Sequence, residues 1–130
     1  MKRVYDFIKG CGIYYLATVD GNEPKIRPFG TIDIFEDKLY IQTGKCKPIY
    51  RQLLDNPNVE LCACKDNRWI RVSGKLVPDD RREPKKHMLD EYPELRNMYS
   101  EDDDNTIVFY FEKGKAVISS FTEPPVEIEF

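Results

Sequence analysis

Residues 38–54, KLYIQTGKCKPIYRQLL, decide the fold prediction because they combine a strand pattern, a glycine turn and a helix pattern. The first six residues are mostly β-branched, aromatic or aliphatic, which is typical of a strand. After Gly44 the spacing changes, and Ile49 and Leu53 lie four residues apart, on one face of a helix. Pro48 is tolerated in a first helical turn. The stretch therefore predicts a strand that leads directly into a two-turn helix.

The residues before this stretch predict a short helix and two more strands. KRVYDFIKG (2–10) has apolar residues at helical spacing and stops at a glycine. GIYYLATV (12–19) is followed by the turn sequence DGNEP and a second extended run, KIRPFGTIDIF (25–35), so the two runs predict a hairpin. A tight turn at Glu36 and Asp37 joins the second run to KLYIQT, and we expect these two to pair as a meander.

The residues after it predict a split or kinked helix among further strands. Residues 83–99 form an amphipathic pattern that Pro93 is expected to kink or divide. The expected adjacent pair of strands is NVELCAC (58–64) and WIRVSGKLV (69–77). A last hairpin is expected around the turn EKGK, with strands TIVFYF (106–111) and AVISS (116–120), and VEIEF (126–130) is expected as the C-terminal strand. Many short antiparallel strands with few helices predict a β-dominated α+β fold, a small closed or partly open antiparallel β-barrel in a single domain over residues 1–130.

Composition excludes several functional classes. The chain has a net charge of −3, which argues against non-specific binding to nucleic acid or anionic membranes. It contains no apolar run long enough for a membrane span, and the N-terminal MKRVYDFIKG has no apolar signal-peptide region, so we expect a cytoplasmic protein. The four cysteines lie in three separate segments, with Cys62 and Cys64 assigned to opposite faces of one strand, so we expect reduced thiols and no metal site.

Positive charge is concentrated in one place in this acidic chain. Residues 38–54 hold two lysines beyond the strand, Lys45 and Lys47, with Lys38 and Arg51 on either side, and no carboxylate. Free amides at the start of the helix that follows can add to these charges. The pattern is typical of a phosphate site, and the alternative is a solvated basic turn. Arg27, on the strand expected to neighbour KLYIQT, would suit a phosphate monoester because guanidinium binds it bidentately.

Three stretches resemble the FMN-binding split barrels related to pyridoxamine 5'-phosphate oxidase, including the small NimA/NimC-like proteins. YYLATVDGNEPKIRPFG is similar to that family's opening hairpin, and KLYIQTGKCKPIYRQLLDNPNVELC to its strand, phosphate-binding helix and following strand. WIRVSGKLV is similar to its next strand, so the resemblance covers nearly the whole chain.

The resemblance implies FMN as cofactor and a homodimer with FMN in the cleft between two barrels. Arg27 and the backbone of residues 28–30 (Pro28, Phe29 and Gly30) would follow the ribityl chain and phosphate. Gln42 and Thr43 would approach the flavin, and Lys45 or Lys47 would neutralise the phosphate. Two residues would reach the flavin from the partner chain: Trp69 and Arg71.

The expected function is an oxidoreductase that passes electrons from NAD(P)H through FMN to a small acceptor such as a nitroaromatic or a quinone. Oxidation of pyridoxamine phosphate is not expected, since the chain ends at Phe130, before the substrate-binding C-terminal extension of those oxidases. No catalytic acid or base is assigned, and the single histidine, His87, is expected on the solvated face of a helix.

Two alternatives remain open at this point. One is a flavin or small-ligand binding protein without turnover. The other is a small barrel that stacks single-stranded nucleic acid on four aromatic residues: Tyr14, Tyr15, Phe29 and Trp69. The negative net charge of the chain disfavours this second alternative.

Overall fold

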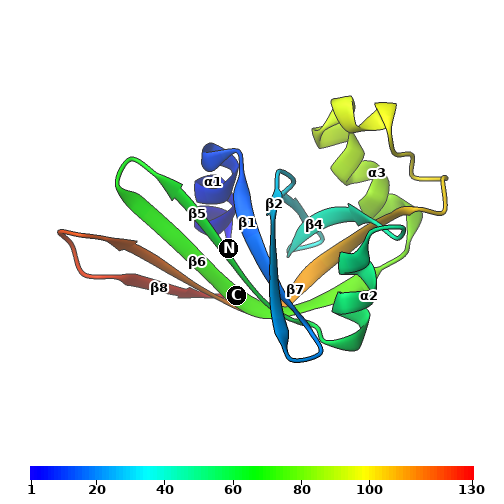
Figure 1. Ribbon diagram of the computed structural model, residues 1–130. Helices are drawn as coiled ribbons and strands as arrows, with labels where there is room; N and C mark the ends of the chain where they lie inside the picture. Colours follow the sequence, from blue (N-terminus) through cyan, green and yellow to red (C-terminus); the bar gives the residue numbers. More distant parts are fainter.

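Eight antiparallel strands form one rolled sheet in the computed structural model, which describes residues 1–130 (Figure 1). The strands are β1 (Tyr14–Asp20), β2 (Glu23–Phe29), β3 (Asp33–Phe35), β4 (Lys38–Gly44), β5 (Asn58–Lys65), β6 (Arg68–Asp79), β7 (Thr106–Ser120) and β8 (Val126–Glu129). Their order is β2-β1-β5-β6-β7-β4-β3, and β8 adds to β7. The predicted β-dominated α+β fold, a split barrel, is confirmed.

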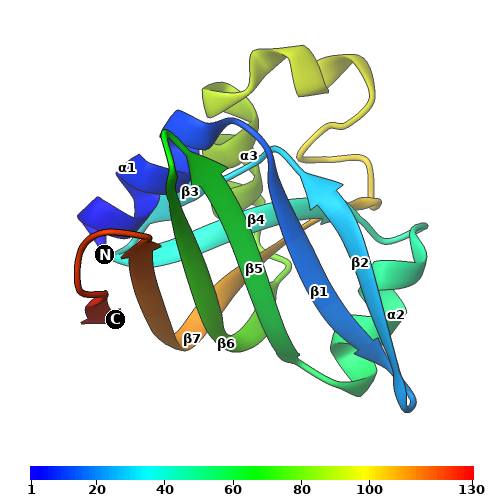
Figure 2. The same cartoon turned by 60° about the vertical axis from the view of Figure 1, so that its left-hand side comes forward.

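The barrel is split because its two end strands do not pair with each other. β2 pairs only with β1, and β3 pairs only with β4. β7 is long enough to serve two neighbours along one edge, β4 through its first residues and β8 through its last. Figure 2 shows β1, β2 and β5 on the near wall, with β4 and β7 behind them.

Four helical segments surround the sheet: α1 (Lys2–Cys11), α2 (Pro48–Asp55), α3 (Arg82–Glu91) and the 3-10 helix η1 (Pro93–Asn97). α1 inserts Val4 and Ile8 into the barrel core, where both are almost fully buried. α2 begins at Pro48, as predicted, and packs against β1. The amphipathic segment is divided at Pro93, also as predicted. None of the helices combines the length and apolar character needed to span a bilayer.

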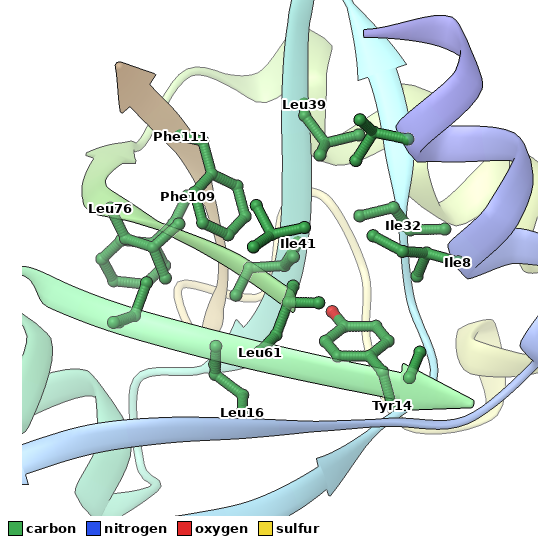
Figure 3. Packing of buried hydrophobic residues seen from close by; sticks show 14 of the residues in the cluster. Ile8, Tyr14, Leu16, Ile32, Leu39, Ile41, Leu61, Leu76, Phe109 and Phe111 are labelled. Atoms are coloured by element: carbon green, nitrogen blue, oxygen red, sulfur yellow. The ribbon is translucent and has the colours of Figure 1, made fainter. Parts of the chain in front are cut away.

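The core fills the barrel with aliphatic and aromatic side chains from all its walls (Figure 3). Leu16 from β1, Leu61 from β5 and Ile41 from β4 are completely buried there. Tyr14 is also fully buried, and its hydroxyl donates a hydrogen bond to the Thr31 backbone oxygen at 2.6 Å. A flat ligand therefore finds no room inside the barrel and must bind outside this core.

The predicted pairing across the turn at Glu36 and Asp37 is confirmed, because β3 pairs with β4 there. The meander fails in one respect: KIRPFGTIDIF is two strands at opposite ends of the sheet, so β2 is not a neighbour of β4. The chain leaves β2 at Phe29 and crosses to β3 at Asp33. Side chains satisfy the backbone of this crossing: Tyr14 binds the Thr31 oxygen, and the Tyr92 hydroxyl bonds both the amide and the carbonyl of Ile32 at 3.1 Å. Such long-range partners leave no trace in local spacing.

The predicted C-terminal hairpin is also wrong, because TIVFYFEKGKAVISS is the single strand β7. The EKGK sequence is an irregularity within the strand, where Lys113 has a φ of 54°, opposite the register shift between Ser73 and Lys75 in β6. Gly114 is needed there because a Cβ at this position would collide with the ring of Phe130.

All four cysteines are free thiols. Cys62 and Cys64 lie on the same face of β5, as the two-residue period of a strand requires, so their assignment to opposite faces was wrong. No three histidine, cysteine or acidic side chains come together as metal ligands.

Candidate functional site

A cleft of about 600 Å³ lies where β2 and β4 fail to pair. Its floor comes from the end of β2, residues 30 and 31, and the end of β4, and one side comes from the start of α2. The opposite wall is η1 with its flanking residues. Seven of the ten residues named from the sequence line this cleft: Arg27, Pro28, Phe29, Gly30, Gln42, Thr43 and Lys47.

Arg27 is a partly buried cation without a carboxylate partner. Its Nη1 donates to the Thr18 hydroxyl at 2.8 Å and to the Leu16 backbone oxygen at 3.1 Å, and its Nη2 donates to Gln52 Oε1 at 2.8 Å. Burial lowers the pKa of its guanidinium, and no neighbouring carboxylate offsets that effect. Every acceptor around Arg27 is neutral, so its positive charge remains available to a ligand.

The two lysines that follow β4 differ in their partners. Lys45 makes an ion pair with Asp80 at 3.0 Å, which raises the pKa of Lys45, and it does not line the cleft. Lys47 lines the cleft, makes no ion pair and is the residue immediately before α2. The cleft therefore has two uncompensated cations, Arg27 from β2 and Lys47 from the start of α2.

The remaining cations of residues 38–54 do not reach the cleft. Arg51 pairs with Asp20 at 3.4 Å, and Lys38 lies over the ring of Tyr110 at 4.7 Å. The concentration of charge in the sequence is thus mostly compensated by partners from distant segments.

The floor between β2 and β4 is held by side-chain bonds in place of strand pairing. The backbone N–H of Gln42 donates to the Thr31 hydroxyl at 3.1 Å, and both residues are buried. The Gln42 side-chain amide donates to the Thr43 backbone oxygen at 3.1 Å. Phe29 packs on Tyr14, with ring centroids 5.8 Å apart. The floor is therefore held together by hydrogen bonds and ring packing, and it offers an aromatic ring beside backbone and amide groups.

The role of η1 as a cleft wall was not predicted from the sequence, which indicated only an amphipathic segment over residues 83–99 that Pro93 would kink or divide. Its cleft-lining side chains are mostly apolar, with one carboxylate: Tyr92, Glu94, Leu95, Met98 and Tyr99. Tyr92 fixes one end through Ile32, and Tyr99 packs closely on Gly44 at the other end. The spacing of Tyr92, Leu95 and Met98 was visible in the sequence, but nothing local showed that they face a cleft.

Trp69 and Arg71 lie away from this cleft, on the outer face of the sheet. Trp69 packs on Phe121, with ring centroids 5.1 Å apart, and Arg71 pairs with Glu60 at 2.9 Å. Strand register places both residues on the face that also carries Tyr15, through the neighbouring pairs of β1, β5 and β6.

His87 is exposed on α3, as expected, with a side chain that is 44% accessible, but it also has a buried partner that the sequence did not indicate. Its Nδ1 lies 2.6 Å from Asp33 Oδ2, and its ring packs near Phe35. The Asp33 side chain is 4% exposed, and burial raises its pKa while the bond to His87 opposes that shift. This pair fastens α3 to β3 and lines no part of the cleft.

The arrangement is suited to a ligand with an anionic end and a flat body. Arg27 and Lys47 provide charge-assisted donors, and the η1 wall provides mostly apolar contacts. No histidine, cysteine or serine lines the cleft, and the only titratable groups besides the cations are Glu94 and two tyrosines. Binding and orientation are therefore what these side chains can contribute.

Comparison with known proteins agrees with this arrangement. Residues 1–117 match the pyridoxamine 5'-phosphate oxidase family. No curated protein sequence matches the chain. Among solved structures, a NimC/NimA family protein from Clostridium acetobutylicum is 42% identical, with a TM-score of 0.97 over 100% of this chain and 92% of that one.

More distant structures share the fold. A putative pyridoxamine 5'-phosphate oxidase from Listeria innocua is 16% identical, with a TM-score of 0.71 over 94% of this chain and 98% of that one. A pyridoxamine 5'-phosphate oxidase-related, FMN binding protein from Nostoc punctiforme is 13% identical, with a TM-score of 0.64 over 99% and 93%. From the match over residues 1–117 and the 42% identical relative, the chain belongs to the pyridoxamine 5'-phosphate oxidase family and, within it, to the NimC/NimA proteins.

Proposed function

We propose that this protein binds FMN in the cleft between β2 and β4 and passes electrons from NAD(P)H to a small acceptor such as a nitroaromatic or a quinone. The observation that carries the proposal is the pair of uncompensated cations, Arg27 and Lys47, in the lining of a cleft whose η1 wall is mostly apolar. The structural relative from Nostoc punctiforme is an FMN-binding protein, which supports the same ligand class.

The residues present fit FMN. Arg27 and Lys47 would hold its phosphate, because a phosphate monoester is a dianion and both cations lack a carboxylate partner. The backbone of residues 28–30, with Gln42 and Thr43, would lie along the ribityl chain and the ring. Bound flavin would supply hydride and electron transfer, which is chemistry that no side chain of this cleft provides.

The η1 wall would keep water away from the reacting end of the cleft. Leu95 and Met98 are apolar, and Tyr92 and Tyr99 contact Ile32 and Gly44 at the two ends of the segment. Excluding water protects a reduced cofactor from side reactions. In this proposal the chain's own residues bind, orient and shield, and none of them transfers a proton.

A homodimer would complete the site. The outer face of β2, β1, β5 and β6 carries exposed apolar residues, with Tyr15 52% and Ile26 69% exposed, and Trp69 and Arg71 lie on the same face. A second copy packed on this face would bury that surface and bring Trp69 and Arg71 close to the neighbouring cleft. Light scattering should then give about twice 15.3 kDa, and a monomer that binds FMN tightly would contradict this arrangement.

The absorption spectrum of the purified protein tests the cofactor. We expect a flavin spectrum, with FMN released on denaturation. Stopped-flow mixing with NADH or NADPH then separates an oxidoreductase from a flavin-holding protein. Only an oxidoreductase would have its flavin reduced, and its flavin band bleached, on the timescale of turnover. Loss of that bleaching with intact FMN binding would favour the non-catalytic alternative.

A further inference from the structure

Gln52 and Thr18 surround Arg27 with neutral hydrogen-bond partners. Gln52 lies on the buried face of α2 and is 5% exposed, and Thr18 lies on β1 and is 2% exposed. The Thr18 hydroxyl donates to Gln52 Oε1 at 2.6 Å, and Arg27 donates to both, through Nη1 and Nη2, at 2.8 Å. The three side chains come from three different elements and close a ring of hydrogen bonds.

This ring fixes the guanidinium without neutralising it. Bonds to Thr18, Gln52 and the Leu16 carbonyl occupy three of the five guanidinium N–H groups, which leaves two for a ligand. A carboxylate in place of Gln52 would give similar hydrogen bonds but would cancel the charge. Two other arginines are paired in that way: Arg51 of α2 with Asp20, and Arg81, immediately before α3, with Asp79.

We infer that Gln52, with Thr18, is the positioning residue that makes this cleft selective for phosphorylated flavin over its unphosphorylated form. The inference rests on the proposed function and extends it. The neutral amide holds the Arg27 guanidinium at the cleft edge, so that its full charge serves a phosphate dianion. Riboflavin has the same ring and ribityl chain but no phosphate, and it gains nothing from that charge.

Titration of the full chain, freed of bound flavin, with FMN and with riboflavin measures this selectivity. Gln52→Glu is nearly isosteric and keeps both hydrogen bonds, but it pairs with Arg27. We expect its FMN affinity to fall tenfold or more while its riboflavin affinity stays within about threefold, so the preference for FMN collapses. Gln52→Met, which removes the acceptor, should also reduce FMN binding selectively.

Two controls separate charge placement from folding. Leu54→Glu adds the same charge on the exposed side of α2, where Leu54 is 51% exposed, and should leave the FMN preference unchanged. Thr18→Val, which removes the hydroxyl, should weaken FMN binding, whereas Thr18→Ser, which retains the hydroxyl, should keep the wild-type affinity. Thermal melts of each variant confirm that the chain is folded at the titration temperature.

The outcomes distinguish this inference from the proposed function. A wild-type preference for FMN that Gln52→Glu leaves intact, or equal losses of FMN and riboflavin, would overturn the role of Gln52 and leave FMN binding standing. If the wild type binds neither flavin, the proposed function fails, and inorganic phosphate becomes the probe. A phosphate-induced rise in melting temperature, relative to chloride at equal ionic strength, should then be present in the wild type and absent in Gln52→Glu; no rise in either would overturn the inference as well.

Discussion

The cleft and the surface around α3 both contain cations, but only those around α3 are paired with carboxylates. Around α3, Arg82 pairs with Asp102 at 2.8 Å, and Lys85 pairs with Asp80 at 2.6 Å. In the cleft, Arg27 has only neutral partners and Lys47 has no ion pair. A count of cations therefore does not locate an anion site. What distinguishes the two regions is that no carboxylate pairs with either cation of the cleft.

The largest effect should follow from reversing a cleft charge. We expect Arg27→Glu and Lys47→Glu each to weaken FMN binding by at least 10- to 150-fold, because one lost charge-assisted contact costs about 1.5–3 kcal/mol before any repulsion. Flavin titration measures the change. Lys113→Glu, an exposed substitution outside the cleft, should leave the affinity within a few-fold.

Arg27 also donates hydrogen bonds to the buried side chains of Thr18 and Gln52. Arg27→Glu therefore carries a risk of unfolding that Lys47→Glu does not. Lys47 is exposed and makes no ion pair, so its variant should melt like the wild type. Unchanged FMN affinity in a folded Lys47→Glu variant would remove α2 from the proposed phosphate site.

The local elements were predictable because their signals are local. The first helix, the helix that begins at Pro48 and the break at Pro93 all follow from spacing and from glycine or proline positions, although the first helix continues past the predicted stop at Gly10 and ends before Gly12. Strand partners were not predictable in the same way. The crossing from β2 to β3 depends on Tyr14 and Tyr92, which are far away in the sequence.

The same distinction between local and long-range signals separates the predictable and the unpredictable parts of the candidate site. The sequence indicated an anion site near Lys45, Lys47 and Arg27, because cations without carboxylates are visible as composition. It did not separate Lys45 from Lys47, since the partner that compensates Lys45 is Asp80, 35 residues further on. The η1 wall was missed for a similar reason, because the side of η1 that faces the cleft is set by contacts to Ile32 and Gly44.

A change in the compensated region should affect stability and leave ligand binding intact. Asp79 has a 9% exposed side chain and accepts bonds from Arg81 and from the Tyr40 hydroxyl. The Arg81 bond, with the Tyr40 bond, lowers the pKa of Asp79 to about 2. We expect Asp79→Asn to lower the free energy of unfolding at pH 7 by about 1–2 kcal/mol, a value reduced from the full linkage because Arg81 is half exposed.

The pH dependence of this difference has a definite sign. A carboxyl group whose pKa is lower in the folded state stabilises the fold above its unfolded pKa of about 3.9. That contribution is lost as the pH falls toward 2, the folded pKa. Urea unfolding should therefore show a constant gap between wild type and Asp79→Asn above about pH 5 that narrows at pH 3. A gap that widens on acidification would contradict the assignment.

The smallest effect should come from Lys45, and it is the sharpest test of the comparison. Lys45 and Lys47 are two residues apart and have the same charge, so a purely compositional view predicts equal losses of FMN affinity. Asp80 compensates Lys45 and holds it outside the cleft. Lys45→Met should therefore change FMN affinity by no more than about threefold, under about 0.7 kcal/mol, whereas Lys47→Met should cost about tenfold or more. Equal losses in the two methionine variants would mean that proximity of charge, and not its compensation, governs this site.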